Sequence, residues 1–311
     1  MIGERILITG ASGYLALNLV NSLSKKFYVR FGSRTEPNID LPINDYAVID
    51  WSSKESLDKA CENIDLIIHS LSLKQNECRN NPTSALKVNT LATSMLLDAA
   101  IKNKVKSFIY LSTSHVYGRP LQGDIQESFS ANLNDPYSIC HKASESIIHF
   151  HHLNQSINAK VFRLSNVFGS PVNKDSSCWD LLVPDLCRQG LFSDRLVLRS
   201  SGNQSINILT MSDFIEFFLW FLYSDHLHSN DLYFNLSGQE HKVIDIAQYI
   251  KERFKVTKNK DLVINTNKKE SSDYFNFKIN NSKLKGIGFL PKNNIKEEID
   301  NLISFCYENL R

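Results

Sequence analysis

The sequence predicts an α/β protein built on a doubly wound parallel sheet, with a smaller mixed α/β lobe towards the C-terminus. Three observations support this fold class. Short apolar runs, typical of buried strands, alternate with helical stretches as far as about residue 165. The first strand runs directly into a glycine-containing turn and a helix. Beyond about residue 170 the alternation gives way to polar loops and short mixed elements.

The expected elements follow one another in a regular order. The expected strands are 5–9, 28–33, 65–70, 107–113 and 159–165, and the expected helices between them are 14–24, 53–61, 81–103 and 136–152. Leu15, Leu19 and Leu23 give the first helix its spacing, and Pro82 suits the first turn of the third. The apolar run 214–223 is too short to span a membrane, and Glu216 interrupts it, so we expect a buried helix.

Composition and charge exclude several classes of protein. Hydrophobic residues make up 42% and charged residues 22% of the 311-residue chain, as in ordinary globular proteins. A formal net charge of +2 leaves no electrostatic footprint for nucleic acid. The six cysteines form no CxxC pair, and no signal sequence precedes the first strand. We therefore expect reduced thiols in a cytoplasmic protein, with no membrane, nucleic-acid or metal partner.

The turn "TGASGYLA" (9–16) indicates a dinucleotide. It follows a strand and opens a helix, which is the context that a phosphate-binding turn requires. Gly10 permits the tight turn, Gly13 lets the backbone approach a pyrophosphate, and Ala16 keeps helix and strand closely packed. A plain strand–helix turn is the other interpretation. The residues expected to bind the cofactor here are Gly10, Ser12, Gly13, Tyr14 and Leu15.

The end of the second strand predicts which dinucleotide binds. An acidic residue there would bind a ribose 2′-hydroxyl and favour NAD. This chain has Ser33 and Arg34 instead, and an arginine suits a 2′-phosphate. We therefore expect NADP. Glu36 lies close enough to keep NAD as an alternative, and a solvated loop charge is the other interpretation of Arg34.

Further motifs follow in order along the chain: "VIDWSS", "DLIIHSLS", "VNTLATSMLLDAA", "LSTSHVYG", "YSICHKASE", "VFRLSNVFGSP" and "KLKGIGFLP". Together with the glycine turn, they resemble the extended short-chain dehydrogenase/reductase family, in its nucleotide-sugar epimerase/dehydratase branch. The resemblance covers nearly the whole chain. It implies a dinucleotide-binding Rossmann core in residues 1–170, to which later segments return, and a mainly substrate-binding lobe in 171–311. It also implies a homodimer formed through the helices at about 82–103 and 136–152.

The resemblance assigns catalytic and substrate-binding roles. Tyr137 matches the tyrosine that exchanges a proton with a sugar hydroxyl while hydride moves to or from the nicotinamide. Thr113 matches the hydroxyl residue that polarises the substrate oxygen, although capping of the strand end is the other interpretation. Asn166 matches a residue that contacts substrate.

The resemblance also extends the cofactor site. Asp50 and Trp51 match positions that flank the adenine, and Leu71 matches one beside the phosphates. Tyr137 and the helix that carries it would contact the nicotinamide end.

In "YSICHK" (137–142) the chain departs from the family, because His141 replaces the lysine one turn after the tyrosine. Positions 137 and 141 share a helix face, so the resemblance implies that His141 orients the nicotinamide ribose. An ordinary histidine is mostly neutral at pH 7 and would lower the pKa of the tyrosine less than a lysine. Lys142 falls on another face, where we expect a surface lysine. This departure supports a second hypothesis, a catalytically impaired dinucleotide-binding sensor or scaffold.

Two further departures limit the chemistry. Ser114 and His115 stand where sugar 4,6-dehydratases carry Asp–Glu, so we do not expect dehydration. His115 is a candidate substrate-binding residue, and structural packing is the other interpretation of it. Ser205 stands where many relatives place an arginine against the substrate diphosphate, and Arg195 and Arg199 are candidates to replace it. The resemblance therefore implies an NADP-dependent reductase or epimerase of a nucleotide-activated sugar. The residues do not separate these two reactions.

Overall fold

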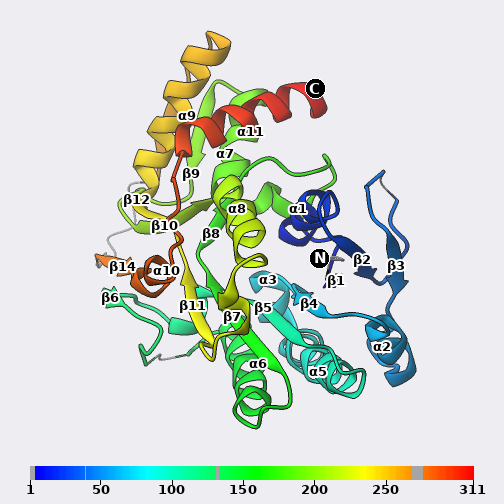
Figure 1. Cartoon of the computed structure of the whole chain (residues 1–311). Helices are drawn as coiled ribbons and strands as arrows, with labels where there is room; N and C mark the ends of the chain where they lie inside the picture. Colours follow the sequence, from blue (N-terminus) through cyan, green and yellow to red (C-terminus); the bar gives the residue numbers. More distant parts are fainter. Residues whose placement is uncertain (1–3, 39, 131–132, 268–275) are drawn as a thin grey trace. The chain divides into compact units, whose positions relative to one another are not determined.

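The computed structural model describes residues 4–38, 40–130, 133–267 and 276–311, which form two compact units. A seven-stranded sheet organises the first unit, made of residues up to 119, 127–164 and 218–235. Its strands are β1 (Arg5–Thr9), β2 (Tyr28–Ser33), β3 (Asp45–Val48), β4 (Leu66–His69), β5 (Ser107–Thr113), β7 (Asn158–Leu164) and β11 (Tyr233–Leu236). They pair in the order β11-β7-β5-β4-β1-β2-β3 (Figure 1).

The sheet confirms the predicted α/β fold class. The pairs from β3 to β7 are parallel, and β1 lies between β2 and β4. Strand order therefore reverses next to β1, and ligands of such sheets bind at the carboxyl ends of the strands on either side of that reversal. Every residue of β4 and β5 is buried, as expected of central parallel strands.

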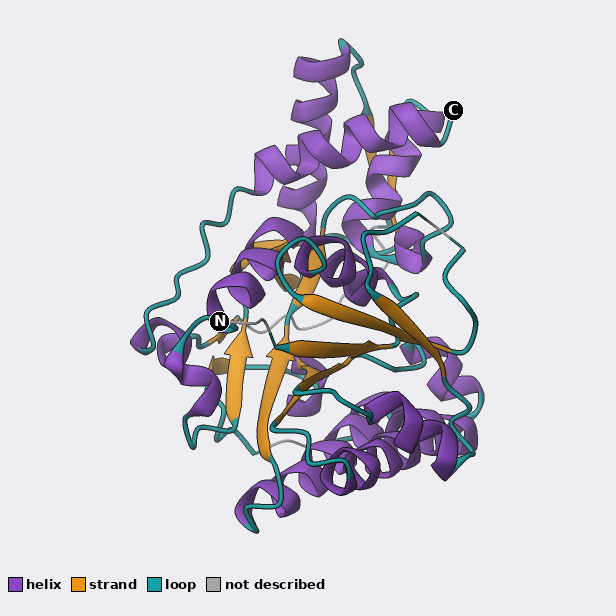
Figure 2. Cartoon of the chain, turned by 45° about the vertical axis from the view of Figure 1, so that its right-hand side comes forward, coloured by secondary structure: helices purple, strands orange, loops and turns teal. Residues whose placement is uncertain are grey.

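Helices cover the sheet of the first unit. They are α1 (Tyr14–Leu23), α2 (Lys54–Cys61), α3 (Gln75–Asn80), α4 (Pro82–Ala85), α5 (Ala92–Lys102) and α6 (Pro136–Leu153), with short 3₁₀ segments η2 (Ser114–Tyr117) and η4 (Asp225–His228). The long helix expected at 81–103 is interrupted by a π-helical segment, η1 (Leu86–Leu91). This segment, α5 and α6 lie side by side (Figure 2).

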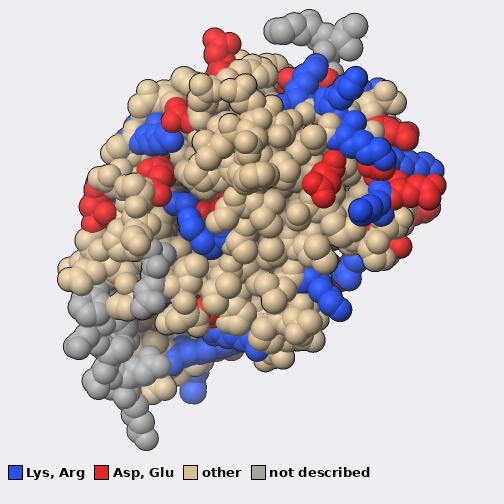
Figure 3. All heavy atoms as spheres, turned by 90° about the horizontal axis from the view of Figure 1, so that it is seen from below, with Lys and Arg blue, Asp and Glu red and all other residues tan. Residues whose placement is uncertain are grey.

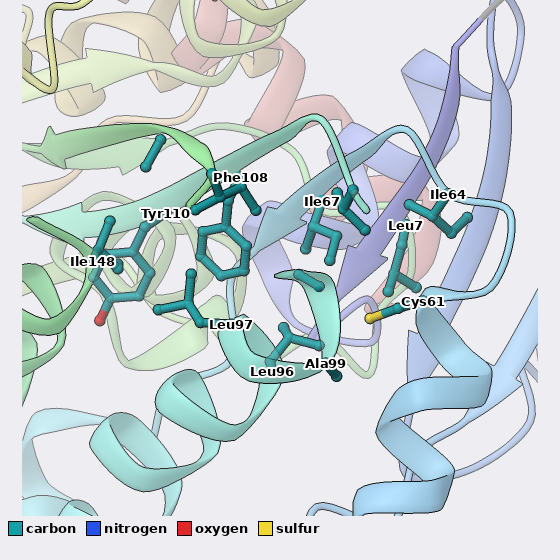
Figure 4. Close-up of a cluster of buried hydrophobic side chains, with 14 of the residues drawn as sticks. Leu7, Cys61, Ile64, Ile67, Leu96, Leu97, Ala99, Phe108, Tyr110 and Ile148 are labelled. Atoms are coloured by element: carbon teal, nitrogen blue, oxygen red, sulfur yellow. The ribbon is translucent and has the colours of Figure 1, made fainter. Parts of the chain in front are cut away.

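A hydrophobic cluster holds α2, α5 and α6 against the sheet (Figure 4). Phe108 of β5 projects towards Leu97 of α5, Ile67 of β4 projects towards the same helix, and all three side chains are fully buried. Tyr110 and Ile148 extend the same cluster to α6. Because this packing presses α6 onto β5, it determines where the first turn of α6 meets the end of that strand.

The second unit contains residues 120–126, 165–217 and 236–311, within the described part of the chain. Its strands are β6 (Gly123–Ile125), β8 (Asn166–Phe168), β9 (Arg195–Leu198), β10 (Ser205–Thr210), β12 (Gln239–Lys242), β13 (Val263–Thr266) and β14 (Phe277–Ile279). Its helices are η3 (Ser177–Asp180), α7 (Leu182–Phe192), α9 (Val243–Lys258), α10 (Ser282–Gly286) and α11 (Ile295–Asn309). It also includes α8 (Met211–Phe221) as far as residue 217. The strands form one three-stranded and two two-stranded sheets, a mixed α/β arrangement.

The apolar run at 214–223 forms most of α8, and Phe214, Phe217, Phe218 and Phe221 are fully buried, which confirms the expected buried helix. Within the described residues, no helix combines the length and apolarity that crossing a membrane would need. Figure 3 shows basic and acidic side chains interspersed on one face, around a broad uncharged area. All six cysteines are buried.

Candidate functional site

The turn after β1 fits a phosphate-bearing ligand. Gly10 has a φ of 66°, and a Cβ at this position would lie 2.9 Å from the backbone nitrogen of Leu71. Only glycine tolerates both this conformation and this approach to the chain after β4. Gly13 is the N-cap of α1, and among the described residues no side chain caps this end of the helix. Because uncapped N–H groups and the helix dipole attract anions, this end can receive a pyrophosphate.

The structure places the other predicted residues of this turn around the same helix end. Ser12 is exposed, Leu15 is half-buried and Tyr14 is buried in the first turn of α1. Leu71 follows the carboxyl end of β4, the strand on the other side of the reversal in strand order. The two backbone segments that could contact a dinucleotide therefore meet at the topological switch point.

At the end of β2 the two predicted residues differ in exposure. Ser33 is buried, and its Oγ accepts the N–H of Thr35 at 3.2 Å. Arg34 is exposed. Glu36 accepts a hydrogen bond from the Tyr46 hydroxyl at 3.0 Å. Of the two predicted residues, Arg34 is therefore the one that is accessible from solvent.

Asp50 and Trp51 follow β3 and Ile49. Asp50 is exposed, and Ser52 donates to its carboxylate from both N–H (2.9 Å) and Oγ (2.6 Å), which lowers the pKa of Asp50. The Trp51 ring lies 5.9 Å from the His69 ring, against the hydrophobic cluster of the first unit. Its indole nitrogen is buried and has no hydrogen-bond partner in the described chain. Asp50 is thus the more accessible of this predicted pair.

Tyr137 and Thr113 meet where β5 ends and α6 begins. Asp135 caps α6 by accepting the N–H of Tyr137 at 2.9 Å, so the tyrosine is held in the first turn. Thr113 ends β5, and its Oγ accepts the N–H of His115 at 3.2 Å. Thr113 therefore caps the end of the strand, which was the other interpretation of this residue. The Thr113 side chain also lies close enough to the Tyr137 hydroxyl to lower its pKa. Burial raises the pKa of Tyr137 to about 12, against the opposing effect of hydrogen bonds with Thr113 and Ser72.

His141 lies one turn further along the same face of α6 and is 2% exposed. Its Nδ1 is 2.7 Å from the Tyr110 hydroxyl, and its Nε2 is 3.1 Å from the Ser72 Oγ. Its ring centre is 4.5 Å from that of Tyr137. Burial lowers the pKa of His141 to about 4, so the imidazole is neutral at pH 7. Both ring nitrogens already have partners within the chain, and contact with a ribose stays a prediction.

A buried ion pair lies one further turn along α6. The Glu145 carboxylate is fully buried and accepts from Arg163 of β7 through both oxygens, at 3.0 and 2.7 Å. Ser112 donates to it at 2.7 Å, and Lys142 at 3.1 Å. Lys142, expected as a surface lysine, is therefore ion-paired and only 40% exposed. The spacing of Tyr137, His141 and Glu145 at i, i+4 and i+8 was a signal in the sequence for this polar face.

The remaining predicted residues fall in different places. The His115 ring meets that of Tyr137 edge-on at 5.8 Å, and burial lowers the pKa of His115 to about 4. Asn166 belongs to the second unit, where it is exposed and donates to the Asn207 carbonyl at 2.9 Å. Ser205 pairs in register with Lys242 across β10 and β12. Lys242 is exposed and is a cation that the sequence reasoning did not consider; Arg195 and Arg199 are exposed as well.

Known proteins resemble this chain in sequence. The model of the NAD dependent epimerase/dehydratase family matches residues 6–235. The chain is 25% identical to a dTDP-D-glucose 4,6-dehydratase of Homo sapiens, covering 98% of this chain and 91% of that one. It is 24% identical to UDP-glucuronic acid decarboxylase 6 of Arabidopsis thaliana, covering 84% and 78%.

Two solved structures share its fold. A UDP-N-acetylglucosamine 4-epimerase of Methanobrevibacter ruminantium M1, in complex with UDP-N-acetylmuramic acid, superposes with a TM-score of 0.82 at 18% identity and covers 99% of both chains. A UDP-glucuronic acid 4-epimerase of Bacillus cereus, in complex with NAD, superposes with a TM-score of 0.80 at 19% identity and covers 98% of this chain and 96% of that one.

Proposed function

Because the chain belongs to the NAD dependent epimerase/dehydratase family, whose members are enzymes of the extended short-chain dehydrogenase/reductase type, we propose that it is an NADP-dependent reductase or epimerase of a nucleotide-activated sugar. The observation that carries the proposal is the placement of Tyr137, in the first turn of α6, beside Thr113 at the end of β5. The pair belongs to the same unit as the glycine turn, and β5 is the strand next to β4.

The residues around the glycine turn fit a dinucleotide. Gly10 leaves space that any Cβ would fill, and α1 offers an uncapped N-terminus for the pyrophosphate. When bound, the nicotinamide would supply the hydride acceptor or donor. NADP is favoured because Arg34 is exposed where an acidic residue would select NAD, and because Glu36 is engaged by Tyr46. NAD stands as the alternative.

In this proposal Tyr137 handles the proton. With a pKa of about 12 its hydroxyl is protonated at neutral pH and is ready to donate to a carbonyl oxygen that is being reduced. In the reverse direction Tyr137 must first lose that proton, so the rate should rise with pH. Thr113 holds the substrate oxygen beside Tyr137. Ser114 and His115 provide no carboxylate next to Thr113, so we propose reduction or epimerisation rather than dehydration, although several relatives are named dehydratases.

The nucleotide sugar is suggested by relatives whose names or bound ligands include UDP- and dTDP-sugars. Asn166 and His115 are the proposed substrate contacts. Arg195, Arg199 and Lys242 are exposed cations of the second unit and are candidates to bind the diphosphate in place of an arginine at position 205. The absence of a CxxC pair among the six cysteines supports a cytoplasmic location. A non-catalytic sensor would tolerate the neutral His141, but the retained Tyr137–Thr113 pair argues against it.

The test is turnover of a panel of UDP- and dTDP-sugars with NADP(H) and NAD(H), with products identified by mass spectrometry and NMR. Tyr137→Phe should abolish turnover and leave cofactor binding nearly intact, because only the proton donor is lost. Tyr223→Phe is the matched control, since Tyr223 is 63% exposed in the same unit. Turnover by Tyr137→Phe at the wild-type rate would show that the assigned mechanism is wrong. Cofactor binding without turnover of any nucleotide sugar would favour the sensor hypothesis.

A further inference from the structure

Asp135 joins α3 to the first turn of α6, and each of its carboxylate oxygens serves one of the two helices. The Oδ1 atom accepts the N–H of Tyr137 at 2.9 Å and so caps α6. The Oδ2 atom accepts from the Arg79 Nε at 2.5 Å and from the Gln75 Nε2 at 3.2 Å. The side chain of Asp135 is only 12% exposed. The residue before the catalytic turn is therefore held by two residues of α3.

One face of α3 is directed at this turn. Gln75, Cys78 and Arg79 stand at i, i+3 and i+4, so they share a face of the short helix. Cys78 is fully buried in a small cluster against which Tyr137 packs. The same face of α3 therefore packs beside Tyr137 through its thiol and holds Asp135 through its two polar side chains.

The cap places a negative charge beside Tyr137. Burial raises the pKa of Asp135, but the bonds from Arg79 and from the N–H of Tyr137 outweigh burial, so the net pKa is lowered and the side chain is ionised at neutral pH. A fixed anion opposes the formation of a second anion nearby, here the phenolate that Tyr137 becomes when it acts as base. The residue that holds Tyr137 in place therefore also makes its deprotonation harder.

We propose that Arg79 offsets most of this charge, so that the Asp135–Arg79 ion pair positions Tyr137 for proton transfer. The inference rests on the role of Tyr137 proposed above. The substrate proton moves to or from Tyr137 alone, and neither member of the pair gains or loses a proton, so both are positioning residues. Because the imidazole of His141 is neutral at pH 7, the balance of charge around Tyr137 depends on this pair.

The other groups around Tyr137 leave this balance unchanged. The titratable side chains packed near it are Cys78 of α3, Tyr110 of β5, His115 of η2, and Cys140 and His141 of α6. All are uncharged at pH 7, because burial raises the pKa of the thiols and of the Tyr110 phenol and lowers the pKa of both imidazoles. The charged residues further out are the exposed Glu77 and Arg119, and Glu145 with its partners Arg163 and Lys142. In the described chain, Asp135 is the one of these charges that bonds to Tyr137, and Arg79 is its counterion.

A titration without turnover tests the charge balance. The full-length protein is made with 3,5-difluorotyrosine, whose phenol is more acidic than that of tyrosine, and the ¹⁹F signal of position 137 is identified by its loss in Tyr137→Phe. Asp135→Asn keeps a good capping acceptor and removes the negative charge, so the pKa of this phenol should fall. Arg79→Gln removes the cation, so the pKa should rise. Each shift should be about 0.5–1.5 units, as expected for one unit charge roughly a side-chain length away at an effective dielectric constant of about 20.

The double variant separates charge balance from structural damage. Asp135→Asn combined with Arg79→Gln removes both charges, so the pKa at position 137 should return close to that of the wild type. Damage to the turn would instead shift the pKa in the same direction in all three variants, and that result would overturn the proposal. Arg79 is 55% exposed, so Arg79→Gln should fold even if Asp135→Asn does not. An unchanged pKa in Arg79→Gln is by itself enough to refute the inference.

Kinetics test the consequence for the reaction. In the direction in which Tyr137 acts as base, the rise of kcat with pH should move to lower pH in Asp135→Asn and to higher pH in Arg79→Gln. Arg79→Lys keeps the charge and should give a profile close to that of the wild type. Lys106→Gln is the matched control, because Lys106 is 66% exposed and pairs with Asp65 at 2.8 Å at the amino ends of β4 and β5. If the wild type turns over no nucleotide sugar, the proposed function fails, while the ¹⁹F titration still decides this inference.

Discussion

Glu145→Gln should destabilise the first unit more than any comparable change at the surface. The carboxylate is fully buried and accepts four hydrogen bonds, two from Arg163, one from Ser112 and one from Lys142. The amide keeps the shape but removes the charge, which leaves the 2%-exposed guanidinium without a counterion. Breaking a buried pair in this way costs roughly 3–5 kcal/mol, a large part of the about 5–15 kcal/mol that stabilises a typical domain.

Urea unfolding followed by circular dichroism measures the loss. Glu252→Gln is the matched control, because Glu252 pairs with Lys296 at 3.1 Å while both side chains are about half exposed, and such pairs contribute less than about 1 kcal/mol. If Glu145→Gln unfolds within about 1 kcal/mol of the wild type, the pair does not stabilise α6 as argued.

The same variant should change the pH dependence of stability. Burial raises the pKa of Glu145, but its bonds with Arg163 outweigh burial, and the net pKa lies below the ordinary range. A depressed pKa in the folded state gives a stabilisation that is complete above the unfolded value of about 4.3 and is lost as pH falls through the folded value. The difference in stability between wild type and Glu145→Gln should therefore shrink in acid. A difference that grows in acid would contradict this assignment.

Three further predictions concern the cofactor, the proton-transfer site and assembly. If Arg34 binds a 2′-phosphate, Arg34→Ala should erase about 10- to 100-fold of preference for NADP(H) over NAD(H) in fluorescence titrations, and equal affinities in the wild type would disprove it. His141→Lys places a cation beside Tyr137, so the rise of the base-direction rate with pH should move to lower pH; an unchanged pH profile would argue against a direct influence of position 141 on Tyr137. We expect a homodimer, because Leu91 of η1 and Phe150 and Leu153 of α6 are 53–68% exposed on neighbouring helices. Light scattering should give a dimer mass for the wild type and a monomer mass for Phe150→Glu, and a monomeric wild type would exclude this interface.

Local signals explain which parts of the fold could be predicted. The central strands are continuous apolar runs, and α6 begins with Asp135–Pro136, a cap followed by a proline in the first turn. Strand β3 was missed because it is half-buried and only four residues long, at the edge of the sheet. The π-helical segment was missed because residues 81–103 fit one continuous amphipathic helix, and nothing in the local spacing marks the interruption.

The residues of the candidate site likewise divide into those that local motifs predict and those that depend on long-range contacts. Tyr137 and Thr113 were predicted from short motifs, and the structure brings their hydroxyls together. Ser72 and Tyr110 were not predicted, because their partner His141 lies 69 and 31 residues away along the chain. Contacts of that separation form only once β4, β5 and α6 have packed. Long-range hydrogen bonds of this kind leave no periodic trace in a single sequence.

Because all six cysteines are buried, the rate at which each one is alkylated reports how often the structure around it opens. Burial raises the pKa of Cys78 and Cys140, which pack beside Tyr137, and of Cys187 and Cys306 in the core of the second unit. Since the thiolate is the form that reacts, none of these residues should be alkylated until its surroundings separate. Pulsed alkylation read by mass spectrometry would then time two events without an introduced label: loosening around the tyrosine, and unfolding of the second unit.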